Sequence, residues 1–154
     1  MNFATITTAQ SLLIYGYGKE GKSAEKFLKK RFPQLVMTIH DDFLPEYNQP
    51  KTWSDYDVIL LSQGIKAANK AQITKALRKR VTSNTNVFFE NLTEEQRQKI
   101  IGITGTKGKS TTTKFCAEVL AAAGQKVVIA GNYGTPFLDI YDQLEAGVID
   151  YVVA

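Results

Sequence analysis

The sequence has few of the residues that would tie it to an oxidising compartment or a membrane. Of its 154 residues one is cysteine, Cys116, which excludes a disulfide within the chain and is typical of a reducing cytoplasm. No apolar run approaches the roughly 20 residues that span a bilayer. Residues 1–5 lack the basic start and long apolar core of a secretion signal. We therefore expect a cytoplasmic protein that does not insert into membranes.

Strong charge of one sign is also missing. The net charge is +4, spread along the chain, and this gives little support to a nucleic-acid partner. With 44% apolar and 22% charged residues, the composition is that of an ordinary globular protein, which we expect to be monomeric and to act on small molecules. The one histidine, His40, follows an apolar run and precedes two acids, so we expect it to be solvated rather than a general base.

Short apolar runs alternate with helical patterns along the chain. Strands are predicted at residues 11–15, 35–39, 57–62, 86–89, 100–103, 126–130 and 148–153. Helices are predicted at residues 20–31, 69–79, 109–123 and 136–145. This rhythm predicts an α/β protein with parallel sheets and helices on their faces.

A polar, charged segment around residues 91–98 divides the alternation in two. We place a first domain at residues 1–92 and the beginning of a second at residues 99–154. The second domain would have only three strands, which would leave its sheet largely unformed and its apolar edges exposed. We therefore expect the chain to be the front portion of a longer polypeptide.

The most specific motif is a glycine-rich loop between the strand at 100–103 and the helix that follows it. Its residues are Gly105, Thr106, Lys107, Gly108, Lys109, Ser110 and Thr111. Glycines let backbone N–H groups turn toward phosphate oxygens, and the start of a helix adds its positive dipole end. Lys109 would contact the terminal phosphates, and the hydroxyl of Ser110 or Thr111 would bind Mg²⁺. The general Walker pattern fails by one residue, because Ile103 occupies the position of its first glycine.

A second glycine cluster follows the first predicted strand. Residues 16–21 match G-x-G-x-x-G, and Asp41 ends the second strand, 20 residues beyond Gly21, where a ribose-binding carboxylate would lie. This context favours nucleotide binding, although a dinucleotide dehydrogenase would show the same fingerprint. Gly64 follows the third strand, where it would either approach a phosphate closely or simply form a turn.

Together these motifs resemble the Mur ligase family, the ATP-dependent enzymes that build the peptidoglycan stem peptide. The resemblance covers nearly the whole chain and is carried by residues 16–21, 61–65, 82–90, 104–112 and 131–134. The shorter loop pattern Gly-Thr-x-Gly-Lys-Ser/Thr is that of this family and of the related folylpolyglutamate synthetases. Details of the first domain look most like the MurD type, which joins D-glutamate to UDP-N-acetylmuramoyl-L-alanine. The resemblance implies a Rossmann-like first domain and the beginning of a P-loop-type central ATPase domain.

The resemblance also implies roles for individual residues. The UDP-sugar substrate would be bound by Gly18, Lys19, Glu20, Asp41, Asp42, Gly64 and Asn132. ATP would be bound by Gly105, Thr106, Lys107, Gly108, Lys109, Ser110 and Thr111, with Ser110 at Mg²⁺ and Lys109 as the catalytic cation. Two residues depart from the family's pattern: Gln63 replaces the usual proline before Gly64, and Lys107 stands where asparagine is frequent.

The implied reaction is activation of the substrate's alanyl carboxylate as an acyl phosphate, followed by attack of the amine of D-glutamate. The amino-acid site would lie beyond Ala154, so these 154 residues alone are expected to bind ligands without ligating them. Two alternatives remain open. One is another Mur-type ligase or a folylpolyglutamate-synthetase-like ligase. Residues 1–90 argue against the folylpolyglutamate-synthetase-like ligase. The other is a non-catalytic module that binds nucleotides or UDP-sugars.

Overall fold

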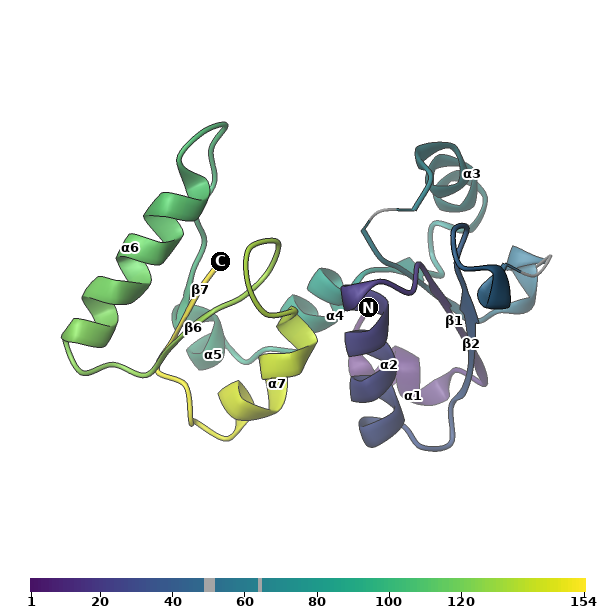
Figure 1. Cartoon of the computed structure of the whole chain (residues 1–154). Helices are drawn as coiled ribbons and strands as arrows, with labels where there is room; N and C mark the ends of the chain where they lie inside the picture. Colours follow the sequence, from purple (N-terminus) through teal and green to yellow (C-terminus); the bar gives the residue numbers. More distant parts are fainter. Residues whose placement is uncertain (49–51, 64) are drawn as a thin grey trace. The chain divides into compact units, whose positions relative to one another are not determined.

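The computed structural model describes residues 1–48, 52–63 and 65–154, and it divides into two compact units, Met1–Glu90 and Asn91–Ala154 (Figure 1). In each unit strands alternate with helices, and every strand pairing among the described residues is parallel. The predicted fold class, a Rossmann-like parallel sheet followed by the beginning of a P-loop-type α/β unit, is confirmed.

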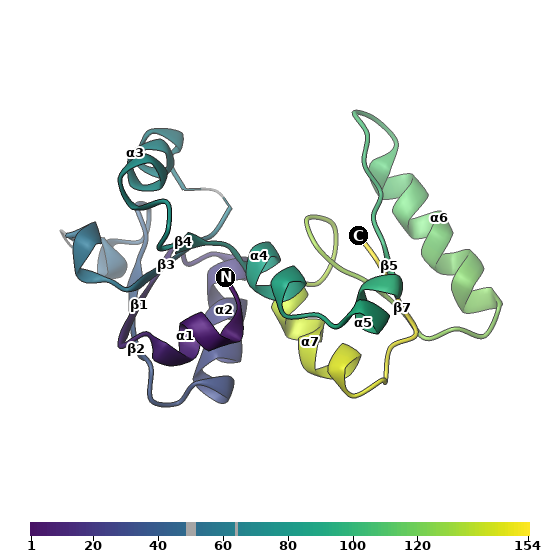
Figure 2. The ribbon, with the colours of Figure 1, turned by 180° about the vertical axis from the view of Figure 1, so that it is seen from behind.

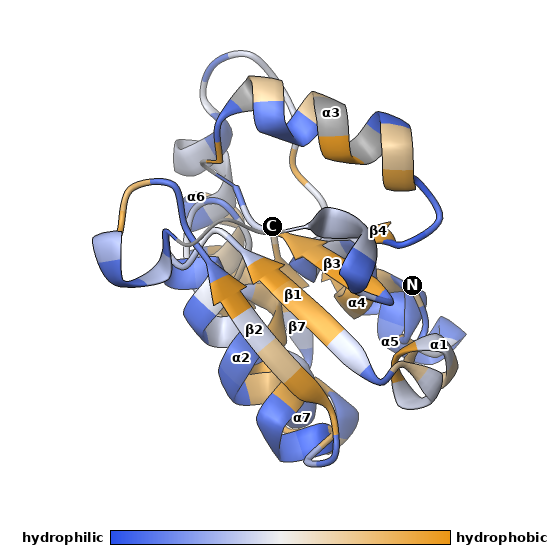
Figure 3. Ribbon diagram, turned by 90° about the vertical axis from the view of Figure 1, so that its right-hand side faces the viewer, coloured by the Kyte–Doolittle hydropathy of each residue, from blue (hydrophilic) through white to orange (hydrophobic). Residues whose placement is uncertain are grey.

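The first unit contains a four-stranded sheet in the order β2-β1-β3-β4. Its strands are β1 (Ser11–Tyr15), β2 (Val36–His40), β3 (Val58–Leu61) and β4 (Val81–Thr82). Its helices are α1 (Phe3–Thr8), α2 (Lys19–Arg31), α3 (Ala67–Leu77) and α4 (Asn84–Glu90), with short 3-10 helices at Pro45–Tyr47 and Trp53–Asp55. The helices α2 and α3 cover opposite faces of the sheet (Figure 3). The strand order therefore reverses between β1 and β3, and ligands collect beside such a reversal in open α/β sheets.

Strand β1 lies at the centre of the core. Its last four residues are fully buried, as is the whole of β3, and both strands are apolar along their length in Figure 3. Leu13 and Tyr15 pack on one face with Ile73 of α3. The other face is covered by α2, whose buried residues are Gly21, Ser23, Ala24, Phe27 and Leu28. Strands buried on both faces read as continuous apolar runs, which is why the sequence predicts them clearly.

Helix α1 was not predicted from the sequence. The side chain of Asn2 caps it by accepting a hydrogen bond from the N–H of Thr5 at 3.0 Å. Phe3 then packs against Phe27 and Phe32, with ring centroids 6.0 and 5.7 Å apart. Figures 1 and 2 accordingly show α1 beside α2. Packing of a single aromatic residue fixes this short helix, which lacks a strong periodic pattern of its own.

The strand predicted at residues 86–89 is wrong, because this segment belongs to helix α4. Ser83 marks the start of the helix: its carbonyl accepts from the N–H of Val87 at 2.9 Å and its hydroxyl from the N–H of Asn86 at 3.2 Å. Val87 and Phe88 are then buried on one side. The β-branched and aromatic residues favoured a strand, but the capping serine and tertiary packing determine the outcome.

The second unit contains a three-stranded sheet in the order β5-β7-β6. Its strands are β5 (Ile100–Ile101), β6 (Val127–Ile129) and β7 (Tyr151–Val153), and its helices are α5 (Glu94–Gln98), α6 (Lys109–Ala122) and α7 (Phe137–Glu145). Thr93 and Gln96 form a reciprocal capping box at the start of α5. Helix α7 is well anchored, since the Tyr141 hydroxyl donates to the carbonyl of Asn91 at 2.8 Å.

Helix α6 is much less covered than α7. It buries only Thr113 and Ala117, and it leaves Phe115 and Val119 exposed at 66% and 52% of their surface. Within the described ranges no helix is both long and apolar enough to cross a bilayer.

The turn between β1 and α2 depends on a close approach of two glycines. Gly16 has a φ of 92°, which favours glycine, and its N–H donates to the carbonyl of His40 at 2.8 Å. A Cβ on Gly21 would lie 2.1 Å from the carbonyl oxygen of Gly16. The third glycine of the motif therefore lets α2 pack directly against the end of β1.

We predict that Gly21→Ala lowers the free energy of unfolding by about 3 kcal/mol, the upper range for overpacking, because the contacted atom belongs to the rigid backbone. The matched control is Gly18→Ala: that glycine has a φ of −72° and no atom within 4 Å of its Cβ position. Because Gly18 is the N-cap of α2, where alanine is less favourable than glycine, the control should cost no more than about 1 kcal/mol. Chemical denaturation of both variants measures the difference, and equal midpoints would contradict the packing role.

Candidate functional site

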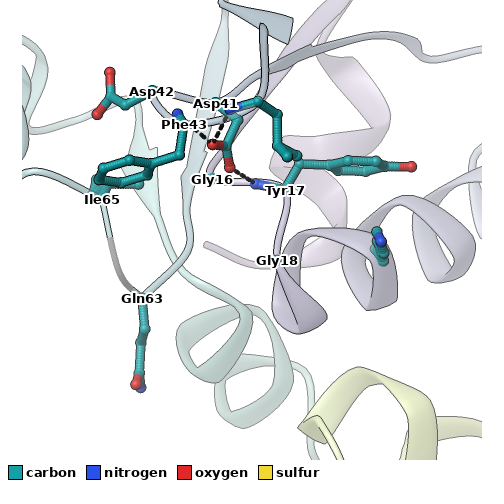
Figure 4. A pocket seen from close by; sticks show the side chains of 10 residues that line it. Gly16, Tyr17, Gly18, Asp41, Asp42, Phe43, Gln63 and Ile65 are labelled. Carbon is teal, nitrogen blue, oxygen red and sulfur yellow. Dashed lines mark hydrogen bonds between the residues drawn. The ribbon is translucent and has the colours of Figure 1, made fainter. Parts of the chain in front are cut away.

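A cavity of about 420 Å³ lies at the carboxyl ends of β1, β2 and β3, beside the reversal of strand order (Figure 4). It is lined by Gly16, Tyr17, Gly18, Lys22, Asp41, Asp42, Phe43, Leu44, Gln63 and Ile65. In Figure 4 the ring of Phe43 lies beside Ile65, while the ring of Tyr17 extends to the opposite side. The space above Gly18 is open, so a ligand can approach the start of α2 closely.

The carboxylate of Asp41 joins two of the loops that line this cavity. One oxygen accepts from the N–H of Tyr17 at 2.6 Å, and the other accepts from the N–H groups of Phe43 and Leu44 at 2.8 and 3.2 Å (Figure 4). Asp41 itself is 8% exposed. The sequence spacing thus brings Asp41 to the glycine turn, and there its carboxylate organises the backbone of the site.

Asp42 forms a second, separate network under the cavity. Its carboxylate accepts from the Tyr15 hydroxyl at 2.7 Å and from the Asn69 amide at 3.2 Å. Burial acts to raise the pKa of Asp42, but hydrogen bonds from Tyr15, the Lys66 backbone and Asn69 outweigh it and hold the pKa below its usual value. Burial, reinforced by Asp42, raises the pKa of Tyr15. The lowered pKa favours the charged carboxylate of Asp42, so the network places negative charge beside Asp41.

His40 belongs to the same buried cluster, so the expectation of a solvated histidine is wrong. It is 5% exposed, and its ring lies edge-on to Tyr15 and Trp53 at centroid distances of 4.9 and 5.3 Å. Trp53 in turn stacks on Tyr15 at 5.0 Å. Trp53 packs against the core cluster of the sheet and does not line the cavity.

The cation at the cavity is Lys22, a residue that sequence reasoning missed. Lys22 lies four positions after Gly18, one helical turn into α2, and its Nζ is 5.7 Å from the centre of the Tyr17 ring. Helical spacing from the first glycines could have identified it. Lys19 and Glu20, predicted to bind substrate, do not line the cavity. Gly64 lies outside the described residues.

Tyr17 is held in place by a charged pair on α2. Its hydroxyl donates to the carboxylate of Glu25, which also accepts from Lys29 at 2.6 Å. The hydrogen bond to Glu25, followed by burial, raises the pKa of Tyr17 to about 12. Lys29, followed by Tyr17, lowers the pKa of Glu25. One wall of the cavity is therefore a neutral, fixed aromatic ring.

In the second unit, the loop at residues 102–108 joins β5 to α6 as predicted. Gly108 precedes α6 with a φ of 78°, and its carbonyl accepts from the N–H of Thr112 at 2.9 Å. The Lys109 ammonium donates to the carbonyls of Gly105 and Thr106, the latter at 3.5 Å. All seven predicted residues, 105–111, are exposed to solvent. The loop is thus open to solvent, and the first N–H groups of a helix have no acceptor within the helix itself.

Asn132 lies in a tight turn after β6. Gly134 has a φ of 145°, and a Cβ there would lie 2.5 Å from the carbonyl oxygen of Ile129. The N–H of Gly131 donates to the carbonyl of Thr135 at 2.9 Å, which closes the turn.

Ser110 and Thr111 line a second cavity, of about 330 Å³, together with Lys114, Phe115, Glu118 and Tyr133. Across the part of the chain that the structure describes, no three acidic, histidine or cysteine side chains cluster as metal ligands.

The fold and these features define a class: an α/β protein with a Rossmann-like sheet, a cavity at its switch point, and a glycine-rich loop between a strand and a helix of a second unit. No protein-family model matches the chain. Among curated proteins, it is 33% identical over 156 residues to the UDP-N-acetylmuramoylalanine–D-glutamate ligase of Wolbachia pipientis wMel, covering 92% of this chain and 30% of that ligase.

Ligases of the same name from other bacteria show similar identities. For Rickettsia prowazekii the identity is 30%, covering 92% of this chain and 34% of the ligase, and for Francisella tularensis subsp. tularensis it is 35%, covering 83% and 30%. The chain thus spans about a third of the length of the curated relatives it matches. The resemblance to the Mur ligase family is confirmed: the chain is similar to the N-terminal portion of its MurD type.

The Asp41 carboxylate should contribute strongly to stability because it holds two loops together. Asp41→Ala removes the acceptor of three N–H groups and should lower the free energy of unfolding by about 2–4 kcal/mol. Asp55→Ala is the control, because Asp55 is exposed, and it should cost less than about 0.5 kcal/mol. Denaturant unfolding compares the two variants. A variant lacking Asp41 that is as stable as the control would contradict the tether.

The titration of the Tyr17 hydroxyl should depend on Glu25. Glu25→Gln removes the charge behind its raised pKa, so the pKa should fall from about 12 toward the ordinary value of about 10. Because the folded-state pKa is raised, the stability that this bond contributes is present below about pH 10 and is lost as the pH rises through 12. Ring-carbon NMR against pH measures the shift, with Glu95→Gln in the second unit as control. An unchanged Tyr17 titration in Glu25→Gln would rule out this cause.

Proposed function

We propose that this chain supplies the UDP-sugar-binding and ATP-binding parts of an ATP-dependent amide ligase of peptidoglycan precursor synthesis. The proposed substrates are UDP-N-acetylmuramoyl-L-alanine, D-glutamate and ATP with Mg²⁺. The observation that carries the proposal is the exposed strand–loop–helix at residues 100–111, found in a chain similar to ligases named for this reaction.

The cavity of the first unit suits a uridine diphosphate because acidic side chains line one part of the cavity and positive charge lies at another part. Asp41 and Asp42 give it an acidic floor, which favours the N–H and hydroxyl donors of uridine. Lys22 and the start of α2 provide positive charge on the side of Gly18, which favours the diphosphate. Within this proposal Gly18, Asp41 and Asp42 form the ligand's surroundings, while Lys19, Glu20, Gly64 and Asn132 rest on the resemblance alone.

The loop of the second unit suits the phosphates of ATP. Gly105 and Gly108 have positive φ, and no atom fills the Cβ position of Gly108, so backbone N–H groups can face a ligand. The Lys109 ammonium already lies over the loop carbonyls of Gly105 and Thr106 and would turn to the terminal phosphates. Thr106 and Lys107 complete the loop, and Ser110 with Thr111 begins the helix. Mg²⁺, held by Ser110 and the phosphates, would neutralise charge on the transferred group.

The proposed chemistry joins two anions, so positive charge is its main requirement. An oxygen of the alanyl carboxylate attacks the γ-phosphorus of ATP, the bond to the β-phosphate oxygen breaks, and ADP leaves. The amine of D-glutamate then attacks the acyl carbon, and phosphate departs to leave an amide and a proton. Lys109 contributes by holding the phosphates and by stabilising the charge that develops during phosphoryl transfer.

The test is binding of each ligand to the 154-residue chain. Calorimetry should detect Mg²⁺ with a non-hydrolysable ATP analogue and, independently, UDP. Lys109→Ala should weaken binding of the nucleotide analogue by at least about tenfold, since a charge-assisted phosphate contact is lost. Binding of UDP should not change, and Lys126→Ala, which removes an exposed lysine of the same unit, should leave both affinities unaltered. A folded chain that shows no heat with the ATP analogue would overturn the proposal.

A further inference from the structure

Asn69 is a polar residue on the side of α3 that packs toward the sheet. It is the third residue of the helix, and Ile73, one turn further along the same side, is buried in the core cluster with Leu13 and Tyr15. The helix does not depend on Asn69 for its start, because its N-cap is Lys66. Asparagine is also a weaker helix former than alanine. The hydrogen bonds of Asn69 therefore point to a role outside its own helix.

The Asn69 amide closes a triangle of hydrogen bonds with Tyr15 and Asp42. Its Nδ2 donates to the hydroxyl oxygen of Tyr15 at 2.7 Å and to the two carboxylate oxygens of Asp42 at 3.2 and 3.3 Å. The Tyr15 hydroxyl donates to Asp42 at 2.7 Å. Because the hydroxyl oxygen already accepts from Asn69, its single proton is directed to Asp42. The triangle thus determines which group donates and which accepts.

The ring of Tyr15 is itself held firmly. It is fully buried, Trp53 stacks on it at a centroid distance of 5.0 Å, and His40 lies edge-on to it at 4.9 Å. The hydroxyl at the end of the ring therefore has a fixed position beside the carboxylate of Asp42. Asn69 reaches both groups from a different element, so it connects α3 to the end of β1 and to the loop after β2.

The triangle leaves Asp42 with the capacity to accept one more hydrogen bond. A carboxylate has about four acceptor positions, and Tyr15, Asn69 and the backbone N–H of Lys66 use about three of them. The Nε2 of His40 is 3.7 Å from Oδ1 of Asp42, which is beyond hydrogen-bond distance. Asp42 also lines the cavity. A donor group of a bound ligand therefore meets a carboxylate whose orientation is already set.

We infer that Asn69 is a positioning residue for the ligand of this cavity, because together with Tyr15 it orients the Asp42 carboxylate as an acceptor. The inference rests on the proposed function for its probe, UDP. Asn69 is not among the described residues that line the cavity, so it acts through Asp42. Without Asn69 the carboxylate would have more rotational freedom, and the ligand would have to order it on binding. Helix α3 thereby contributes to binding without touching the ligand.

A double-mutant cycle tests this role, with UDP affinity measured by calorimetry on the 154-residue chain. Asn69→Ala should weaken UDP binding about fivefold, and Tyr15→Phe, which keeps the buried ring, should have a similar effect. In the Asp42→Ala background, Asn69→Ala should change the affinity by less than about twofold, because the group through which it acts is gone. Asn86→Ala is the matched control: Asn86 is the exposed third residue of α4, and its loss should leave UDP affinity unchanged.

A second measurement separates positioning from a merely structural role and does not require UDP. The carboxyl ¹³C signal of Asp42, followed against pH, should show a higher pKa in Asn69→Ala, because hydrogen bonds to the charged form are lost. Asn86→Ala should leave this pKa unchanged. Backbone amide signals of β3 that match those of the natural chain show that each variant is folded.

The outcomes distinguish the inference from the function on which it rests. If Asn69→Ala binds UDP as tightly as the natural chain, or loses the same factor with and without Asp42, the inference is overturned while the proposed function stands. An Asp42 pKa that does not respond to Asn69→Ala also overturns it. If the natural chain shows no heat with UDP, the UDP-sugar part of the proposed function fails and the inference fails with it.

Discussion

Three backbone N–H groups converge on one buried carboxylate, that of Asp41, and the form of the first unit's cavity depends on this interaction. It joins the glycine turn after β1 to the loop after β2, and it adds to the hydrogen bond that the Gly16 N–H donates to the carbonyl of His40. Hydrogen bonds accepted by a carboxylate that is shielded from water are stronger than those between neutral groups. The cavity is therefore set before any ligand arrives, which reduces the entropy lost on binding.

The two units differ in how closely a helix packs against the glycine-rich loop. In the first, α2 packs directly on the turn because Gly21 allows contact with the carbonyl of Gly16. In the second, the loop at residues 105–111 is exposed, and α6 buries only two of its residues. One site is thus a preformed cavity within a packed core, while the other is an open loop that a polyanionic ligand would order. Such loops belong to the less stable parts of a fold.

Much of the fold could be predicted because its strands are buried on both faces. The continuous apolar runs of β1 and β3 favour buried strands, and the glycine pattern at residues 16–21 indicates where α2 begins. The prediction fails at residues 86–89, where the same β-branched and aromatic residues lie in a helix whose start is set by Ser83. Residue type alone does not distinguish a buried strand from a short buried helix. Helix α1 escaped prediction for a similar reason, since the packing of Phe3 stabilises it.

The candidate site was predictable in position and less so in detail. Spacing along the chain located Asp41 and the phosphate loop, because both follow the ends of predicted strands. It did not reveal that the Asp41 carboxylate accepts hydrogen bonds from backbone N–H groups of neighbouring loops. An aspartate at this position can bind either a ligand or a loop, and spacing does not distinguish the two. Lys22 was missed in favour of Lys19 because the resemblance pointed to the first residue of the helix, whereas the helical turn brings the fourth residue after Gly18 to the cavity.

The stacking of Trp53 on Tyr15 gives the chain a built-in optical reporter. Trp53 is the only tryptophan of the sequence, and its neighbour Tyr15 is bonded to Asp42, which lines the cavity. Light emitted from the indole ring thus originates in the first unit alone. The wavelength and intensity of this emission report changes near Asp42 in the first unit, while ligand binding at the loop of the second unit has to be followed by other means.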